Sequence, residues 1–141
     1  MIRKTVLRVV SKALIPFIAL FAFYTQFHGD YGPGGGFQAG VILAAGVVLH
    51  GLIFGLAETR RVLPPRVVEV GAALGVLVYG GTGVLCVLLG GNFLDYDVLP
   101  EVLGMGGQHL GVFLVELGVG LTVSSVMVGI LGAFSARGRE L

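Results

Sequence analysis

Four long apolar stretches constrain this chain more than any other feature of its sequence. They cover about residues 5–27, 37–56, 67–90 and 108–134, and each is long enough to cross the ~30 Å hydrocarbon core of a bilayer as a helix. Their apolar residues are continuous rather than alternating, which favours helices over the strands of a membrane barrel. The sequence therefore predicts an all-α integral membrane protein with four transmembrane helices, forming a single domain over residues 1–141.

The composition excludes several other classes of protein. Charged residues make up 12% of the chain, roughly half of their share in an ordinary soluble domain. The net charge is +1, so we expect no basic surface for nucleic acid. Cys86 is the only cysteine, which excludes an internal disulfide and a cysteine-based metal site. A nucleophile with an adjacent base, an HExxH motif and a dinucleotide fingerprint are all missing, so we expect neither an enzyme nor a bound cofactor.

The basic residues indicate how the four spans are oriented. All nine lie before or early in the first span, between the second and third spans, or in the C-terminal tail, whereas the other two connections carry acidic residues. Lys and Arg favour the cytoplasmic side of a membrane. We therefore expect the N and C termini to be cytoplasmic. The nine residues are Arg3, Lys4, Arg8, Lys12, Arg60, Arg61, Arg66, Arg137 and Arg139.

A cleaved signal peptide is an alternative interpretation of the first apolar stretch, because Arg3 and Lys4 precede it. Pro16 interrupts the apolar run, however, and no A-x-A cleavage site follows it. Cleavage would also leave three spans and distribute the basic segments over both sides of the membrane. We therefore favour a first span that remains part of the protein.

Small residues spaced four apart indicate how the helices pack. Helices in lipid associate through close contact of such residues, because lipid tails are as apolar as leucine. We expect smooth stripes of this kind to pack against helices of this chain or of other subunits, although glycine is also simply common in membrane helices. The stripes are Gly36/Gly40, Gly51/Gly55, Gly71/Gly75, Gly107/Gly111 and Ser125/Gly129/Ala133.

Glu116 is the most informative polar residue, since it lies eight residues inside the fourth span, about 12 Å along a helix. An ionised carboxylate is costly in hydrocarbon and usually faces a protein interior or a water-filled path. His109 lies two turns earlier on nearly the same face, and Gly120 leaves room one turn inward. We predict that Glu116, His109 and water contribute to a proton or cation path, or that Glu116 anchors its helix to a partner helix.

His50 is a second candidate for proton transfer, because a histidine side chain changes charge near neutral pH. It lies in the second span, about two turns from the end that we expect to be cytoplasmic. A single histidine in a helix is more often held by a backbone carbonyl or by a neighbouring helix. Both interpretations of His50 remain open at this point.

The run from Pro33 through Gly34, Gly35 and Gly36 to Phe37 opens the second span. Consecutive glycines cost backbone entropy, so a steric reason for them is expected, such as another chain passing close to the backbone. They also expose N–H groups at the positive end of a helix, where a carboxylate from a partner would be held. We interpret the run as a docking motif; the alternative is an ordinary tight turn.

Together these features resemble the MnhB or MrpB family, which are membrane subunits of the multisubunit Na⁺/H⁺ antiporters of the Mrp or Mnh type. The resemblance rests on the basic N-terminus with Leu14-Ile15-Pro16, the PGGGF run, the four-span length and the glycine-rich last span with its glutamate. It implies an accessory subunit of a hetero-oligomeric complex that exports Na⁺ in exchange for H⁺ and supports pH and sodium homeostasis. The implied location is a prokaryotic plasma membrane, and the implied partners are large complex I-like subunits and small membrane subunits.

Two alternatives to an antiporter subunit remain open. A self-sufficient small exporter, acting as a homodimer, usually carries an acidic residue in its first span, and this chain has none there and no Trp. A purely structural or assembly subunit, including one of a hydrogenase-type membrane complex, would fit the many small-residue stripes. In an antiporter, Na⁺ and H⁺ would be transported ions rather than cofactors.

Overall fold

Helices account for most of the computed structural model, which describes residues 2–29 and 34–138, with side chains from Lys4 onward. Four of them are long and apolar enough to cross a membrane, and no strand occurs in the described ranges. They lie close to the four expected spans, so the prediction of an all-α protein with four membrane-spanning helices is confirmed. These are α1 (Ile2–Phe27), α2 (Gly36–Phe54), α4 (Pro65–Leu88) and α5 (Gly107–Arg137).

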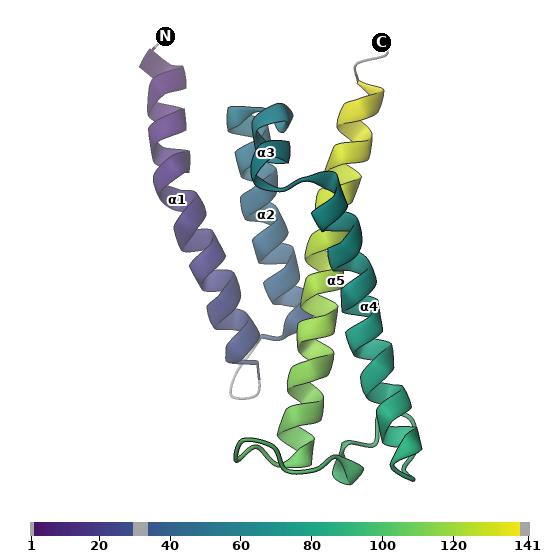
Figure 1. Cartoon of the computed structure of the whole chain (residues 1–141). Helices are drawn as coiled ribbons and strands as arrows, with labels where there is room; N and C mark the ends of the chain where they lie inside the picture. The colour runs from purple at the N-terminus through teal and green to yellow at the C-terminus, as the bar shows by residue number, and fades with distance from the viewer. Residues whose placement is uncertain (1, 30–33, 139–141) are drawn as a thin grey trace.

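The four long helices form an open row rather than a closed bundle (Figure 1). Their order in space is α1, α2, α5, α4: α5 packs against both α2 and α4, whereas α1 packs mainly on α2. As a result, α1 exposes large apolar side chains such as Phe17 and Leu20, which are 68% and 66% exposed. Such a surface suits lipid or other membrane subunits and not water.

Small residues bring α4 and α5 into backbone contact. A Cβ atom built on Gly75 would lie 2.7 Å from the carbonyl oxygen of Gly118, and one on Gly118 would lie 2.8 Å from the carbonyl oxygen of Gly75. One turn away, a Cβ on Gly71 would lie 2.5 Å from Ser125 Oγ. The stripe of Gly71 and Gly75 therefore packs within this chain, as glycines at the contacts of membrane helices do.

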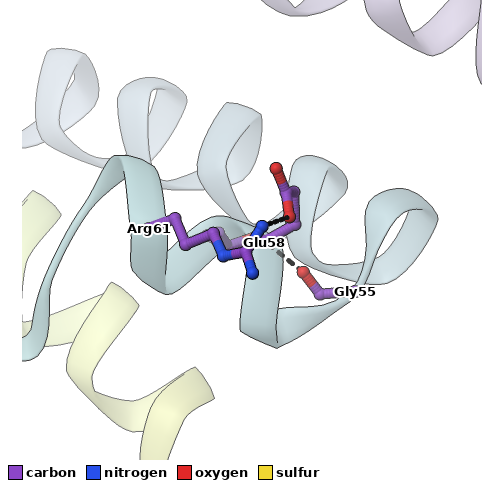
Figure 2. A network of polar contacts seen from close by, with 4 residues as sticks. Gly55, Glu58 and Arg61 are labelled. Atoms are coloured by element: carbon purple, nitrogen blue, oxygen red, sulfur yellow. Dashed lines mark hydrogen bonds and ion pairs between the residues drawn. The ribbon is translucent and has the colours of Figure 1, made fainter.

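A short helix, α3 (Leu56–Val62), lies where the sequence suggested the end of the second span and a loop. The expected second span continued to Leu56, but α2 ends at Phe54 because Gly55 has a φ of 97°, which glycine adopts without strain. Figure 2 shows Gly55 at the start of α3 and the pair formed by Arg61 and Glu58, 3.3 Å apart. Both side chains are exposed, so this ion pair contributes little to stability.

The two ends of the molecule differ in charge. Both termini lie at one end together with α3, and we call this the terminal end; the opposite end, with the α1–α2 turn and the α4–α5 connection, is the loop end (Figure 1). This separation of charges was predicted from the sequence, and the cytoplasmic placement of the terminal end remains a prediction. Among the described side chains, the terminal end holds the basic residues together with two acids, Glu58 and Glu69, whereas the loop end holds acids and no Lys or Arg. The basic residues are Lys4, Arg8, Lys12, Arg60, Arg61, Arg66 and Arg137, and the acids of the loop end include Asp95, Asp97 and Glu101.

The connection between α4 and α5 folds back onto the ends of these helices. It contains a 3₁₀ turn, η1 (Tyr96–Val98). The ring of Tyr96 lies against Gly111 of α5, and a Cβ on Gly107 would lie close to the carbonyl oxygens of Tyr96 and Leu99. The stripe formed by Gly107 and Gly111 therefore accommodates this connection and not another helix.

Candidate functional site around Glu116

The backbone of α5 at Glu116 touches the first residue of α2. A Cβ atom built on Gly36 would lie 2.7 Å from the carbonyl carbon of Glu116 and 2.9 Å from its Cα. One turn further along both helices, a Cβ on Gly40 would lie 2.7 Å from the carbonyl oxygen of Gly120. The expected stripe of Gly36 and Gly40 is thus the contact surface between α2 and α5.

The side chain of Glu116 points into the turn that joins α1 to α2. A Cβ on Gly29, just after α1, would lie 2.8 Å from Glu116 Oε2, and a Cβ on Gly35 would lie 3.1 Å from Oε1. Any larger residue at Gly29 or Gly35 would therefore displace the carboxylate. Gly35 also has a φ of 147°, which residues with a side chain rarely adopt.

This placement puts a negative charge at the positive end of a helix. The first N–H groups of α2 have no acceptor within their own helix, and the helix dipole adds partial positive charge there. A carboxylate at such a helix end contributes about 0.3–1 kcal/mol when exposed and more when partly buried. The sequence suggested that this end of α2 would hold a carboxylate from a partner; in the structure, Glu116 of the same chain lies there.

Glu116 lies level with the start of α2, although it is well inside α5. It is nine residues beyond Gly107, about 13 Å along the axis. The ends of α4 and α5 extend further at the loop end than the end of α1 and the start of α2 do (Figure 1). Counting from the start of α5 therefore overstates how deeply Glu116 lies relative to the shorter helix α2.

The other residues of the predicted docking motif have different surroundings. Pro33 lies outside the described residues. A Cβ on Gly34 would lie 3.1 Å from the carbonyl oxygen of Thr25, so Gly34 packs against the end of α1. Phe37 is 60% exposed, which leaves its ring available to a neighbouring subunit or to lipid.

His109 is not adjacent to Glu116. It lies in the first turn of α5 and is exposed, and the separation of seven positions from Glu116 corresponds to about 10 Å along the helix. A proton passing between His109 and Glu116 would therefore need water or another group between them. The shared path predicted for these two residues remains a prediction.

His50 lies at the other end of α2 and belongs to a separate group of contacts. Its Nδ1 is 2.8 Å from Thr59 Oγ1, and the Thr59 hydroxyl donates to the carbonyl oxygen of Gly55 at 3.1 Å. Because the hydroxyl has one proton, the His50 Nδ1–H group donates to Thr59. His50 thus ties α3 to α2, about 21 Å along α2 from Gly36, and its role in proton transfer remains a prediction.

Gln26 of α1 is part of the site and was missed by the sequence reasoning. Its side chain is 7% exposed, and a Cβ on Gly120 would lie 2.5 Å from Gln26 Oε1. The only signal in the sequence is an uncharged amide next to the end of the first span, where polar residues are common. Gln26 thus joins α1 to α5 one turn from Glu116.

Known proteins match the chain over nearly its whole length. A family model described as a domain related to the MnhB subunit of Na⁺/H⁺ antiporter matches residues 6–129. A protein named putative antiporter subunit mnhB2 from Staphylococcus haemolyticus is 34% identical over 135 residues, which is 92% of this chain and 93% of that protein. Its namesake from Staphylococcus aureus strain Newman is 32% identical over 134 residues, with the same coverage. The match to the family model includes Glu116, Gln26 and the glycine run.

Proposed function

Because the chain belongs to the family of MnhB-related Na⁺/H⁺ antiporter subunits, we propose that it is an accessory subunit of a complex that exports Na⁺ in exchange for H⁺. The complex lies in a prokaryotic plasma membrane and supports pH and sodium homeostasis. Its other members are the large and small membrane subunits that complete the transport path. The transported ions are substrates of the complex and not resident cofactors of this chain.

The open row of helices supports a role as one part of a larger assembly. In this arrangement α1 has one main neighbour within the chain, and α4 likewise packs mainly on α5. Apolar side chains on the outer faces of these helices, such as Phe17 of α1 and Leu77 of α4, are 68% exposed each. A closed bundle would enclose a path of its own, whereas this row offers long faces to neighbouring subunits.

Co-purification tests this assignment. We expect the tagged chain, extracted in a mild detergent, to be recovered with much larger hydrophobic chains that mass spectrometry identifies as antiporter subunits. Recovery of a homodimer alone, with Na⁺/H⁺ exchange after reconstitution, would contradict the proposal and favour a self-sufficient exporter. Recovery with hydrogenase-type subunits would favour the assembly role in that class of complex.

Within this function, we assign Glu116 to the path of the transported ion at the loop end. The observation that carries this assignment is the position of the carboxylate between Gly29 and Gly35, where two helices and a turn meet. A carboxylate in such a place attracts a cation or accepts a proton. If Glu116 served only as an anchor, removing its charge would weaken its contact with the positive end of α2, but complexes that still assemble would exchange ions normally.

Glu116→Gln separates these two roles. We expect the variant to assemble normally, because glutamine keeps the shape of the side chain, and to lose most of the Na⁺/H⁺ exchange measured in everted vesicles by a pH-sensitive dye. Glu116→Asp, which keeps the charge, should retain part of the activity. Glu101→Gln is the matched control, since Glu101 is an exposed acid at the same end. Normal Na⁺/H⁺ exchange by an assembled Glu116→Gln complex would contradict a role in the ion path and would leave Glu116 only an anchoring role.

A further inference from the structure

Gln26 carries a buried polar atom whose bonding capacity is not used. The side chain is 7% exposed, and its Nε2 has no hydrogen-bond partner among the described residues. A buried donor without an acceptor is costly, so native proteins usually satisfy such groups with protein or with ordered water. The amide therefore requires an acceptor beyond those that the described residues provide.

A cavity of about 210 Å³ lies beside this amide, between α1, α2 and α5. Its lining is mostly apolar, and the side chains of Gln26 and Ser124 are the polar groups in it. The other lining residues are Ala22, Phe23, Phe27, Ala39, Gly40, Leu43, Leu117, Gly120 and Leu121. Small residues on α2 and α5 leave this space open. Its volume is sufficient for several water molecules, each of which occupies about 30 Å³ in the liquid.

One face of α5 leads from Glu116 to this cavity, whose lining includes Gly120 and Ser124 but not Glu116 itself. Glu116, Gly120 and Ser124 are spaced four residues apart and so lie on successive turns of nearly the same face, about 6 Å between turns. Gln26 Oε1 lies next to Gly120, and the Ser124 hydroxyl, which donates to the carbonyl oxygen of Leu121 at 3.2 Å, still has lone pairs to accept a bond. One or two water molecules between Gln26 and Ser124 would span this turn.

We propose that this cavity is a water-binding site, in which the amide of Gln26 and the hydroxyl of Ser124 hold water that extends the polar path from Glu116 toward the terminal end. The proposal rests on the proposed role of Glu116 in transport. Water is the ligand that fits, because it accepts a bond from Nε2 and donates one to Ser124 in a small space. A lipid tail or an apolar side chain from a partner would fill the volume but leave the amide unsatisfied.

Cysteine labelling reports water in the cavity directly. Ser124→Cys is placed in a background in which the buried Cys86 is replaced by alanine, and the intact complex in liposomes is treated with a small cationic methanethiosulfonate. Val126→Cys is the control, because Val126 lies on the same helix but is 46% exposed on its outer side. Since the reactive species is the thiolate, which forms in water, we expect Ser124→Cys to react roughly ten times faster than the more exposed control.

Two outcomes of this labelling would overturn the proposal. Ser124→Cys reacting no faster than Val126→Cys would mean that the cavity is dry or filled by lipid or by a partner. Fast labelling that persists unchanged when Gln26→Leu is added would mean that the amide does not hold the water. The proposal expects Gln26→Leu to lower the labelling rate to that of the control.

Thermal unfolding of the complex shows independently whether the cavity is hydrated, and it can be used even if Ser124→Cys fails to assemble. In a dry cavity, Gln26→Leu would remove an unsatisfied donor and raise the unfolding midpoint. In a hydrated cavity, we expect this variant to unfold at the same temperature as the wild type or lower, and Gln38→Leu, at an exposed amide of α2, serves as its control. Labelling and unfolding do not measure transport, so a negative result in either would contradict the water site and not the antiporter function. Conversely, if the complex showed no Na⁺/H⁺ exchange, both experiments would still test the water site.

Discussion

Gly36→Ala is expected to separate α2 from α5 and to lower strongly the amount of this chain that is recovered in its complex. The new methyl group would lie within 3 Å of the carbonyl carbon and the Cα of Glu116. These are backbone atoms, so no side-chain rotation can relieve the overlap, and one helix has to move away from the other. Overpacking typically costs about 1–3 kcal/mol where side chains can adjust, and a contact between two backbones belongs at the upper end of that range or beyond.

The recovery and the thermal midpoint of the purified complex measure this effect. Gly51→Ala is a matched control on the same helix, because the nearest atom to its Cβ would be Leu131 Cδ2 at 3.3 Å, the end of a flexible side chain. We expect the control to assemble with nearly normal stability. Equal stability and recovery of the two variants would show that α2 and α5 are further apart at Glu116 than the structure places them.

Much of the fold could be predicted from the sequence because hydrocarbon imposes simple requirements on a chain. Continuous apolar length gave the four spanning helices, and the separation of basic from acidic connections matched the two ends of the molecule. The short helix α3 was not predicted, since Gly51 and Gly55 were interpreted as a packing pair. Gly55 instead has a positive φ and nothing within 4 Å of its Cβ position, and spacing alone does not distinguish a turn from a contact.

Most residues of the candidate site were predicted from the sequence, but the contacts between them were not. Glu116 was expected to need a protein or aqueous neighbour, and the glycine run was expected to hold a carboxylate. The contact between them could not be predicted, because Gly36 and Glu116 are 80 positions apart in the sequence. The type of a residue also does not indicate which distant residue it contacts. Gln26 was missed for a related reason, since an uncharged amide becomes informative only when its burial is known.

The reciprocal contact between Gly75 and Gly118 is expected to be the second position where one methyl group disrupts the chain. A Cβ on Gly75 would lie 2.7 Å from the carbonyl oxygen of Gly118 and 2.7 Å from the nitrogen of Thr122. Lipid provides no hydrophobic force that presses helices together, so α4 and α5 depend on this close packing. We therefore expect Gly75→Ala to lower the unfolding midpoint and to make the chain sensitive to protease in detergent.

Gly80→Ala on the same helix is the control, because it makes the same substitution at a position without a close contact. A Cβ on Gly80 would meet nothing within 4 Å, and alanine favours a helix by about 1 kcal/mol over glycine, so this variant should be unchanged or slightly more stable. Gly118→Ala should lower the unfolding midpoint as much as Gly75→Ala, since both methyl groups enter the same gap.

The double variant tests whether the two glycines form one contact. Once α4 and α5 have separated, the second methyl group costs little more, so the double variant should lose clearly less stability than the sum of the single losses. Additive losses would mean that the two glycines act at separate contacts, and the backbone contact between α4 and α5 would then be wrong.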